Sequence, residues 1–579
     1  MSTRQNVSES QTVDGKPSRQ DFALEALVDF PDDAICAPEP ITPAHIDAMM
    51  RRLAECGVRR VSWIIYCDGR GGFLVPDHDP KFKNMAQTYQ GLGQNPLLVA
   101  VEAAHRHGLE IYGCFKPYET GGSMLFPEGS YEGMVYGRPS QIGGRMTWMD
   151  PFVADHPHLR IKRRSGDLPA NIQHIPICGL KLRKLDTLPT RVTRDHLQIW
   201  VSDLNFRYRR LDIPFTVTET IEPCPRDVQE FKAVTGQYLA RKGEPQRVLT
   251  LSGFSLTDRY VLVTTDFTEG PADFANTDLE LLSALDAQGR EIPGVIASGK
   301  AIWLQEKVDF RHWGLMFDLG QAGQPMHLDE PNGDGRKGII AFARGRNEYL
   351  PGALCETEPE VQAYWLSQVQ LMLDSGVDGV EIRESNHSMH TSHTEEYGFN
   401  EVVLEKCRQR GQVDLATIAQ VRGEAFTDFL ARAKAIIHGR GKKMRIDFQM
   451  DWYRPDQPRQ RRLAYPANRD CQWREWIERG LADGAILRFF SPYTFDFIFN
   501  DALVRELGER CRGKGIPLTV NRYIHEPADL PDELRRVHQD GRFAGFVLYE
   551  TSNFLKIKPG GECDLTIPDL YKGLQNVLR

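Results

Sequence analysis

The chain has 579 residues, which is more than one simple hydrophobic core accommodates, so two or more domains are expected. Hydrophobic residues make up 41% and charged residues 26%, a composition typical of a soluble globular protein. The formal net charge of −8 argues against a nucleic-acid-binding protein, because such proteins usually carry a basic surface. No apolar run is long enough to span a bilayer, and the polar start lacks the apolar core of a signal peptide. We therefore expect a cytoplasmic protein without a membrane partner, in which eleven scattered cysteines are reduced thiols.

The first part of the chain alternates between short apolar runs and helix-like segments. Residues 1–20 are rich in Ser, Gln, Asn and Thr, which is typical of a flexible tail. The apolar runs predict three strands, at 26–30, 61–66 and 110–116. Each helix opens with a capping residue and a proline and ends at a glycine: Thr42–Pro43 to Gly57, and Asn95–Pro96 to Gly108.

The hydrophobic period changes in the middle of the chain. Residues 120–190 are rich in Gly, Pro and Met, and residues 191–335 alternate with a period of two, which predicts short strands between turns. We interpret 191–335 as a β-sandwich domain inserted between the third and fourth strands of a barrel. The barrel itself then takes residues 21–190 and 336–579. Long loops at the catalytic face of such barrels tolerate insertions of this kind.

The strand–helix rhythm resumes after the insertion. Thr357 and Glu360 have the spacing of a capping box, Pro359 suits a first helical turn, and Gly376 ends the helix. The remaining predicted strands are 377–384, 443–449, 484–490, 517–521 and 545–550. Eight such units predict an α/β fold, a closed (β/α)8 barrel with its chemistry at the carboxyl ends of the strands.

Polar residues on these strands are candidates for chemistry, because side chains alternate between the two faces of a strand. Val380 and Ile382 suit the apolar outer face of the fourth strand. Glu381 and Arg383 therefore point toward the barrel axis, with Glu384 at the strand tip. The same reasoning gives inward or strand-tip polar residues on other strands, namely Tyr66, Lys116, Arg445, Asp447, Gln449, Arg488, Asn521 and Glu550.

Paired carboxylates at such positions suit glycoside hydrolysis, in which one carboxyl protonates the leaving oxygen and the other attacks the sugar or activates water. We favour Glu381 and Asp447 as the catalytic pair, followed by Glu550 and Glu384. The competing interpretation is a structural ion network, because buried charges need partners. For any single residue the two interpretations are equally plausible, whereas the gathering of the whole set at strand ends favours catalysis.

The expected substrate is a saccharide. Aromatic rings at the strand ends suit stacking on sugars, and arginine forks bind carboxylate and sulfate well. An anionic sugar is therefore a hypothesis, although these cations would also neutralise the carboxylates. The residues expected to bind substrate are Lys116, Tyr66, Arg383, His387, Arg488, Asn521 and Trp452.

Three histidines at a spacing of three follow the fourth strand, at 387, 390 and 393. Together with Glu395 or Glu396 they are one possible zinc site, but no second distant group of ligands accompanies them. We favour a substrate-binding loop with His387 in contact with the sugar. The sequence therefore predicts neither a metal nor a cofactor. No nucleic-acid partner is expected, and a homo-oligomer is compatible with the composition.

Several segments resemble uncharacterised TIM-barrel proteins of the glycoside hydrolase type, often called family-10-like glycosyl hydrolases. They are Asn95-Pro96-Leu97-Leu98 with the run 102–110, Phe152 to Pro157, and Pro359-Glu360-Val361 leading to 376–380. The resemblance implies the barrel fold and action on glycosides. Many relatives place an aspartate at the position of Arg383, so either Glu381 or Glu384 replaces it or the chemistry differs.

The sequence thus predicts a glycoside hydrolase that acts on a small saccharide. A first alternative is a sugar lyase or isomerase on the same barrel, with Lys116 or His387 as the base. A second alternative is a carbohydrate-binding protein without catalysis, which the arginine at position 383 motivates.

Overall fold

Eight parallel strands close into one barrel in the computed structural model, in the order β1-β2-β3-β19-β20-β21-β22-β23. Their bounds are β1 (Ala23–Val28), β2 (Arg60–Ile65), β3 (Glu110–Phe115), β19 (Gly379–Arg383), β20 (Lys443–Gln449), β21 (Gly484–Phe489), β22 (Leu518–Tyr523) and β23 (Gly545–Tyr549). A closed barrel of eight parallel strands with intervening helices is the (β/α)8 fold, which confirms the fold class predicted from the sequence.

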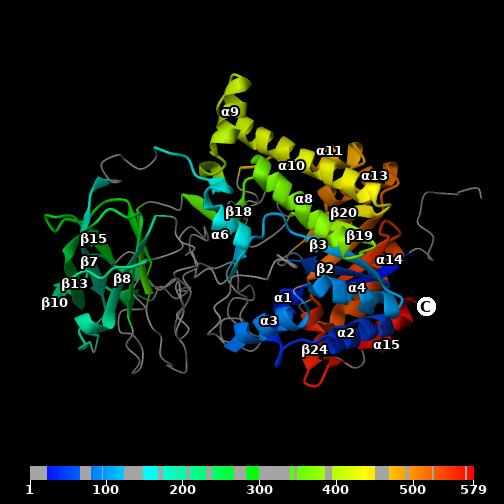
Figure 1. Ribbon diagram of the computed structural model, residues 1–579, viewed down its shortest axis with the longest axis horizontal. Coiled ribbons are helices and arrows are strands. Elements are labelled where there is room, and N and C mark those ends of the chain that lie inside the picture. The colour runs from blue at the N-terminus through cyan, green and yellow to red at the C-terminus, as the bar shows by residue number, and fades with distance from the viewer. Residues whose placement is uncertain are drawn as a thin grey trace, which may run out of the picture.

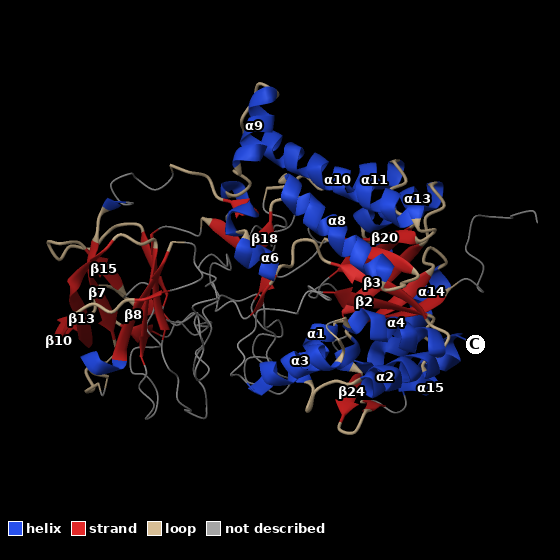
Figure 2. Cartoon of the chain, in the orientation of Figure 1, coloured by secondary structure: helices blue, strands red, loops and turns tan. Residues whose placement is uncertain are grey.

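Helices surround this barrel (Figure 1, Figure 2). In chain order they are α1 (Phe30–Cys36), α2 (Pro43–Glu55), α3 (Pro80–Gly91), α4 (Pro96–Arg106), α8 (Pro359–Asp374), α9 (Glu401–Gln409), α10 (Leu415–Gly439), α11 (Trp473–Glu478), α12 (Phe497–Asn500), α13 (Ala502–Gly513), α14 (Leu530–Asp540) and α15 (Leu570–Leu578). The structure describes residues 22–65, 80–93, 95–122, 148–166, 174–184, 186–190, 192–203, 209–229, 238–265, 282–298, 339–344, 348–384, 394–449, 468–489, 495–523, 527–566 and 570–578.

Local signals set the starts of the early helices as expected. Thr42 caps α2 in a box with His45, and the Asn95 side chain accepts a hydrogen bond from the Leu98 amide at the start of α4. Such caps satisfy amides that have no partner within the helix. Gly57 follows α2 with a φ of +85°, a conformation that glycine adopts without steric conflict.

Two local predictions are wrong. The N-cap of α8 is Glu358, not Thr357, and no side chain caps this helix; Pro359 fits its first position and fixes the start one residue later than the expected box. The first strand was expected at 26–30 but spans Ala23–Val28, because its register with β23 begins at Ala23 and Phe30 already starts α1.

The apolar outer faces of the strands pack against the helices as predicted. Val380, Ile382, Met444, Ile446 and Phe448 are buried in one continuous apolar core that includes the inner faces of α8 and α10. Because side chains alternate along a strand, the residues between them face the barrel axis. The polar side chains expected inside the barrel are therefore placed there by the apolar pattern on the outside.

Two further sheets lie on the connection between β3 and β19. One has the order β10-β13-β7-β15 and the other β16-β17-β14-β8-β9. Residues of both sheets, among them Leu180, Leu251, Ile199 and Val261, belong to one apolar cluster separate from the barrel core. Their strands are β7 (Ile177–Arg183), β8 (Leu197–Ser202), β9 (Arg209–Arg210), β10 (Thr216–Pro223), β13 (Pro245–Leu256), β14 (Tyr260–Thr265), β15 (Ser283–Leu285), β16 (Val295–Ser298) and β17 (Ile339–Arg344).

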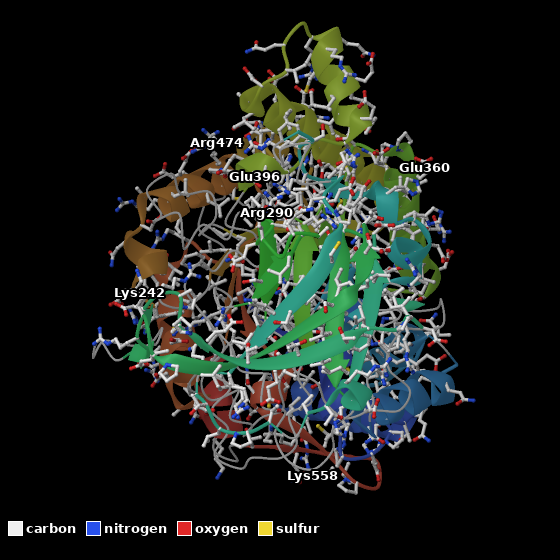
Figure 3. The ribbon with its side chains drawn as sticks, turned by 90° about the vertical axis from the view of Figure 1, so that its left-hand side faces the viewer. Lys242, Arg290, Glu360, Glu396, Arg474 and Lys558 are labelled. Atoms are coloured by element: carbon white, nitrogen blue, oxygen red, sulfur yellow. The ribbon has the colours of Figure 1, made fainter. Side chains whose placement is uncertain are left out.

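Figure 3 views the molecule from the side of these sheets, where Lys242 and Arg290 lie in turns between strands. The segment that leaves the barrel and the segment that returns to it lie next to each other, because β6 (Arg160–Lys162) pairs antiparallel with β18 (Tyr349–Leu354). The domain limits of 191 and 335 stay a prediction, and β7 and β17 lie outside them. Within the described ranges, no helix has both the length and the apolar character needed to cross a bilayer.

We expect Gly423→Ala to destabilise the fold. A Cβ at Gly423 in α10 would overlap the backbone carbonyl oxygen of Asp470, which a side-chain rotation cannot relieve. Overpacking of this kind costs about 1–3 kcal/mol. The control is Gly439→Ala at the end of the same helix, where a Cβ meets nothing within 4 Å. Urea unfolding should show a loss for the first variant and none for the second; equal stabilities would contradict this packing.

Candidate active site

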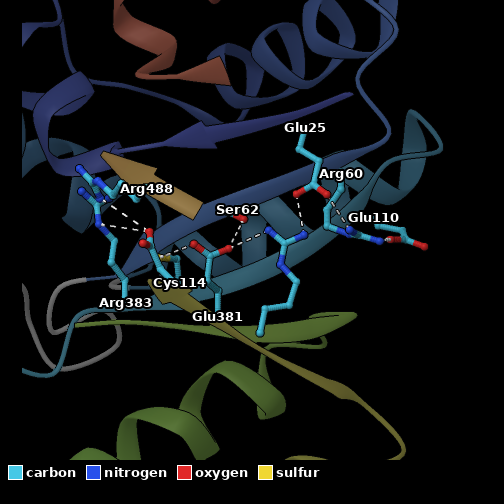
Figure 4. A network of polar contacts seen from close by, with 10 residues as sticks. Glu25, Arg60, Ser62, Glu110, Cys114, Glu381, Arg383 and Arg488 are labelled. Atoms are coloured by element: carbon cyan, nitrogen blue, oxygen red, sulfur yellow. Dashed lines mark hydrogen bonds and ion pairs between the residues drawn. The ribbon is translucent and has the colours of Figure 1, made fainter. Parts of the chain in front are cut away.

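Glu381 lies low inside the barrel, in a network of polar contacts (Figure 4). Its Oε2 accepts hydrogen bonds from Ser62 Oγ at 2.7 Å and from an Arg445 guanidinium nitrogen at 3.0 Å. The Cys114 thiol lies 3.6 Å from its other oxygen. The carboxylate has no exposed surface, and these contacts bind both of its oxygens.

The same network continues across the barrel to the first two strands. Arg445 also pairs with Glu25 at 2.6 Å, and Glu25 pairs with Arg60 at 2.8 Å. Two carboxylates and two guanidiniums therefore compensate one another, as buried charges require. This arrangement favours a structural role for Glu381, which was expected in the catalytic pair.

Asp447 is the next inward-facing residue after Arg445 on β20, and it lies between two arginines. The guanidiniums of Arg383 and Arg488 each approach its Oδ2 to 3.9 Å (Figure 4). Both also lie over the ring of Tyr549, 4.8 and 4.5 Å from its centre, and Arg383 donates a hydrogen bond to the Tyr549 hydroxyl at 3.2 Å. Cation–π contacts of this length hold both guanidiniums in place.

The surroundings of Asp447 perturb its ionisation. Burial raises the pKa of Asp447 well above its usual range, and the positive charge of Arg383 opposes this rise. Asn521 follows on the inward face of β22, in register with Arg488 on β21. Its side chain is also fully buried.

A cluster of carboxyls lies at the ends of β23, β1 and β3. The Lys116 ammonium pairs with Asp29 at 3.4 Å and with Glu119 at 3.1 Å. Glu550 directly follows β23 and accepts a hydrogen bond from the Ser552 hydroxyl at 3.4 Å. All of these side chains except Ser552 are buried.

Burial and mutual repulsion hold protons in this cluster. Burial raises the pKa of Glu550 to about 7, and the Asp29 carboxylate adds to the rise. Burial, Asp29 and Glu550 together raise the pKa of Asp33 in α1 well above its usual range. The carboxylates of Asp29 and Glu119 raise the pKa of Lys116, although burial by itself lowers it. The mouth thus combines a carboxyl that titrates near neutrality with a lysine that stays protonated.

Glu384 belongs to a separate pair. Its carboxylate accepts a short hydrogen bond from Arg469 and lies 3.6 Å from the Cys471 thiol. Arg469 in turn lies over the ring of Phe426 in α10, 4.3 Å from its centre. Burial raises the pKa of Glu384, and Arg469 opposes the rise. These contacts connect the end of β19 with the segment before α11.

The structure thus brings seven of the predicted site residues to the carboxyl ends of the strands: Lys116, Arg383, Glu384, Asp447, Arg488, Asn521 and Glu550. Tyr66, His387 and Trp452 lie outside the described residues. Three acidic members of the mouth were not singled out from the sequence, namely Asp29, Asp33 and Glu119. For Asp29 a signal existed, since it lies at the end of the first predicted strand.

The described residues contain no group of three or more His, Cys, Asp or Glu side chains that could hold a metal ion. His390 and His393 lie outside those residues, as His387 does. Glu396, considered above as a further zinc ligand, forms an ion pair with Arg163 at 2.8 Å.

Comparison with known proteins gives a likeness of fold. No family model and no curated protein matches the chain. Similar solved structures include the catalytic domain of β-amylase from Paenibacillus polymyxa (8% identity, 96% of this chain and 98% of that chain, TM-score 0.36). They also include the glycoside hydrolase domain of PelA from Pseudomonas aeruginosa (15%, 35% and 64%, TM-score 0.21) and a morphinone reductase (10%, 95% and 89%, TM-score 0.30). At these identities and TM-scores the likenesses carry no argument about activity, and the fold assignment rests on the barrel topology.

Glu381→Gln should destabilise the protein, because it leaves the buried Arg445 with less compensating charge. Removing one partner of a buried pair costs about 3 kcal/mol. The matched control is Glu110→Gln, which removes an exposed carboxylate from Arg60 and should change stability by less than about 1 kcal/mol. Urea unfolding of both variants measures the difference. Equal losses would show that the network does not need Glu381.

Glu550→Gln, in contrast to Glu381→Gln, should make the protein more stable than wild type at alkaline pH. The folded-state pKa of about 7 lies above the value of about 4.3 for an unfolded chain, so the folded protein holds a proton that the unfolded chain releases. Wild-type stability therefore falls as the pH rises from 5 through 7, and the variant lacks this loss. From pH 5 to pH 8 the variant should gain roughly 2–3 kcal/mol relative to wild type in urea unfolding. A difference that does not vary with pH would contradict the raised pKa.

Proposed function

We propose that this protein is a glycoside hydrolase that cleaves a glycosidic bond of a small saccharide at the carboxyl-terminal mouth of the barrel. One observation carries the proposal. Glu550, at the end of β23, has a pKa raised to about 7, and the Asp29 carboxylate is the charged neighbour that raises it most. Two neighbouring carboxyls of which one stays protonated near neutral pH are what this reaction requires.

The two carboxyls take different roles because their surroundings differ. Glu550 acts as the general acid and protonates the leaving oxygen, since burial keeps its proton in place up to neutral pH. Asp29 is the second carboxylate, which attacks the sugar or activates water, and the Lys116 ammonium at 3.4 Å compensates its charge. Lys116 thereby positions Asp29.

Asp447 was favoured from the sequence as a member of the catalytic pair, and that assignment stays a prediction. Its location between Arg383 and Arg488 supports a positioning role, in which it directs both guanidiniums into the mouth. Glu381 and Glu384 are each bound by an arginine and are assigned structural roles. Substitution of each carboxyl distinguishes these assignments.

The lyase or isomerase alternative needs a base, and Lys116 was one candidate. Neighbouring carboxylates raise the pKa of Lys116 above its ordinary value, so the amine is protonated at neutral pH. A protonated lysine does not accept a proton from a sugar carbon. The observation therefore favours hydrolysis over elimination with this residue.

Purified protein should release sugar from a panel of aryl glycosides and oligosaccharides, with incorporation of heavy oxygen from labelled water. Glu550→Gln should lower kcat by roughly 10²–10⁴ on phenyl glycosides. It should retain turnover on dinitrophenyl glycosides, because that leaving group needs no proton. For the wild type, kcat/KM should fall as the pH rises above about 7, since the general acid must be protonated.

Asp29→Asn should lose turnover on both kinds of glycoside, because the second carboxylate is needed whatever the leaving group. Glu533→Gln is the matched control: Glu533 is a buried glutamate whose pKa burial raises to about 7, but it lies on α14 and pairs with Arg522 at 2.9 Å. It should retain full activity. Loss of activity in Asp447→Asn with full activity in Asp29→Asn would instead assign the second carboxylate to Asp447. Cleavage without label incorporation would overturn hydrolysis.

A further inference from the structure

Charge is divided unevenly around the barrel mouth. Arg383 and Arg488 come from β19 and β21, on one side of the closed sheet. The carboxyls of Asp29, Glu550 and Asp33 gather near the ends of β1 and β23. An anionic group that enters the mouth is therefore attracted to the two guanidiniums.

The two arginines are held in fixed directions. Each guanidinium lies over the Tyr549 ring, at 4.8 and 4.5 Å, and each is 3.9 Å from the same oxygen of Asp447. A separation of 3.9 Å is within ion-pair distance but longer than a hydrogen bond. Pre-oriented guanidiniums lose little conformational entropy on binding a carboxylate or sulfate.

Asn521 adds an independent observation. Its side chain has no exposed surface, and within the described part of the chain neither its amide nitrogen nor its oxygen has a hydrogen-bond partner. A buried amide without partners is unfavourable, so such groups call for an explanation. Asn521 is in register with Arg488 on the neighbouring strand, and both face the barrel interior. Its NH₂ group is therefore a donor on the strand next to that of Arg488.

We infer that Arg383, Arg488 and Asn521 form a subsite for an anionic substituent of the saccharide, a carboxylate or a sulfate ester. This inference rests on the proposed function and narrows its substrate class to acidic sugars. Arginine supplies paired N–H donors that match the two oxygens of such a group, and the asparagine amide supplies one more.

The first test compares matched substrates that differ only at one carbon. Wild-type protein should show a higher kcat/KM on an aryl glucuronide than on the corresponding glucoside. Asn521→Asp, an isosteric change that places a carboxylate in the subsite, should lower kcat/KM on the glucuronide roughly 10- to 100-fold. On the glucoside it should lower kcat/KM by a smaller factor, because that substrate places no anion in the subsite. Aryl glycosides of a sulfated sugar, run in parallel, distinguish the two anions.

Arg488→Gln and Arg488→Lys extend the comparison. Gln removes the charge and should behave like Asn521→Asp on the acidic substrate, whereas Lys keeps the charge but loses the fork and should recover part of the rate. Thermal unfolding identifies any variant that does not fold. Asn521→Ala then takes the place of that variant, since it removes the amide without placing a charge in the interior.

Ligand binding measured in the absence of turnover tests the anion subsite independently of the proposed hydrolase activity. Titration of Glu550→Gln protein with D-glucuronate, sodium sulfate and D-glucose should show that an anion binds. The further change Asn521→Asp should weaken this binding. If no glycoside is cleaved but this pattern holds, the subsite stands and the hydrolase assignment fails. If neutral glycosides are cleaved faster than acidic ones and the variants slow both alike, the subsite is overturned and the hydrolase stands. If neither anion binds, the inference is overturned.

Discussion

Charge inside the barrel is the constraint on which the rest of this structure depends. An eight-stranded barrel has a packed interior, and a charged group in it is tolerated only when an opposite charge lies beside it. Glu381 and Arg445 meet this condition, and Glu25 and Arg60 extend the same network to two further strands. The network ties four strands together at a level where an apolar barrel would place branched hydrocarbon side chains.

The buried charges lower in the barrel compensate one another, and the charges at the mouth above them are arranged differently. There the charges are sorted, with two guanidiniums around Asp447 on one side and a cluster of carboxyls around Lys116 on the other. Burial raises the pKa of Glu550 to about 7, and the neighbouring Asp29 carboxylate adds to the rise. A region in which repulsion between neighbours persists is unfavourable for stability and suited to proton transfer.

The large insertion is attached at only one of the two ends of the barrel. It leaves after β3 and returns before α8, so it is attached at the carboxyl end of the strands, where the candidate site lies. The pairing of β6 with β18 keeps the outgoing and returning chain together. Two sheets with their own apolar cluster therefore attach to the barrel without interrupting its strand order.

The sequence by itself determined the barrel, because the alternation of short apolar runs with helical periodicity is a local signal that recurs along the chain. It also determined which side chains face inward, since alternation along a strand needs no tertiary information. It did not determine depth along the barrel axis. Glu381 and Arg383 share one face of β19, yet only the register with β20, which sets Glu381 beside Arg445 and Arg383 beside Asp447, assigns the first to the ion network and the second to the mouth. Likewise Asp29 and Glu550 come from opposite ends of the chain, and only closure of the barrel between β1 and β23 makes them neighbours.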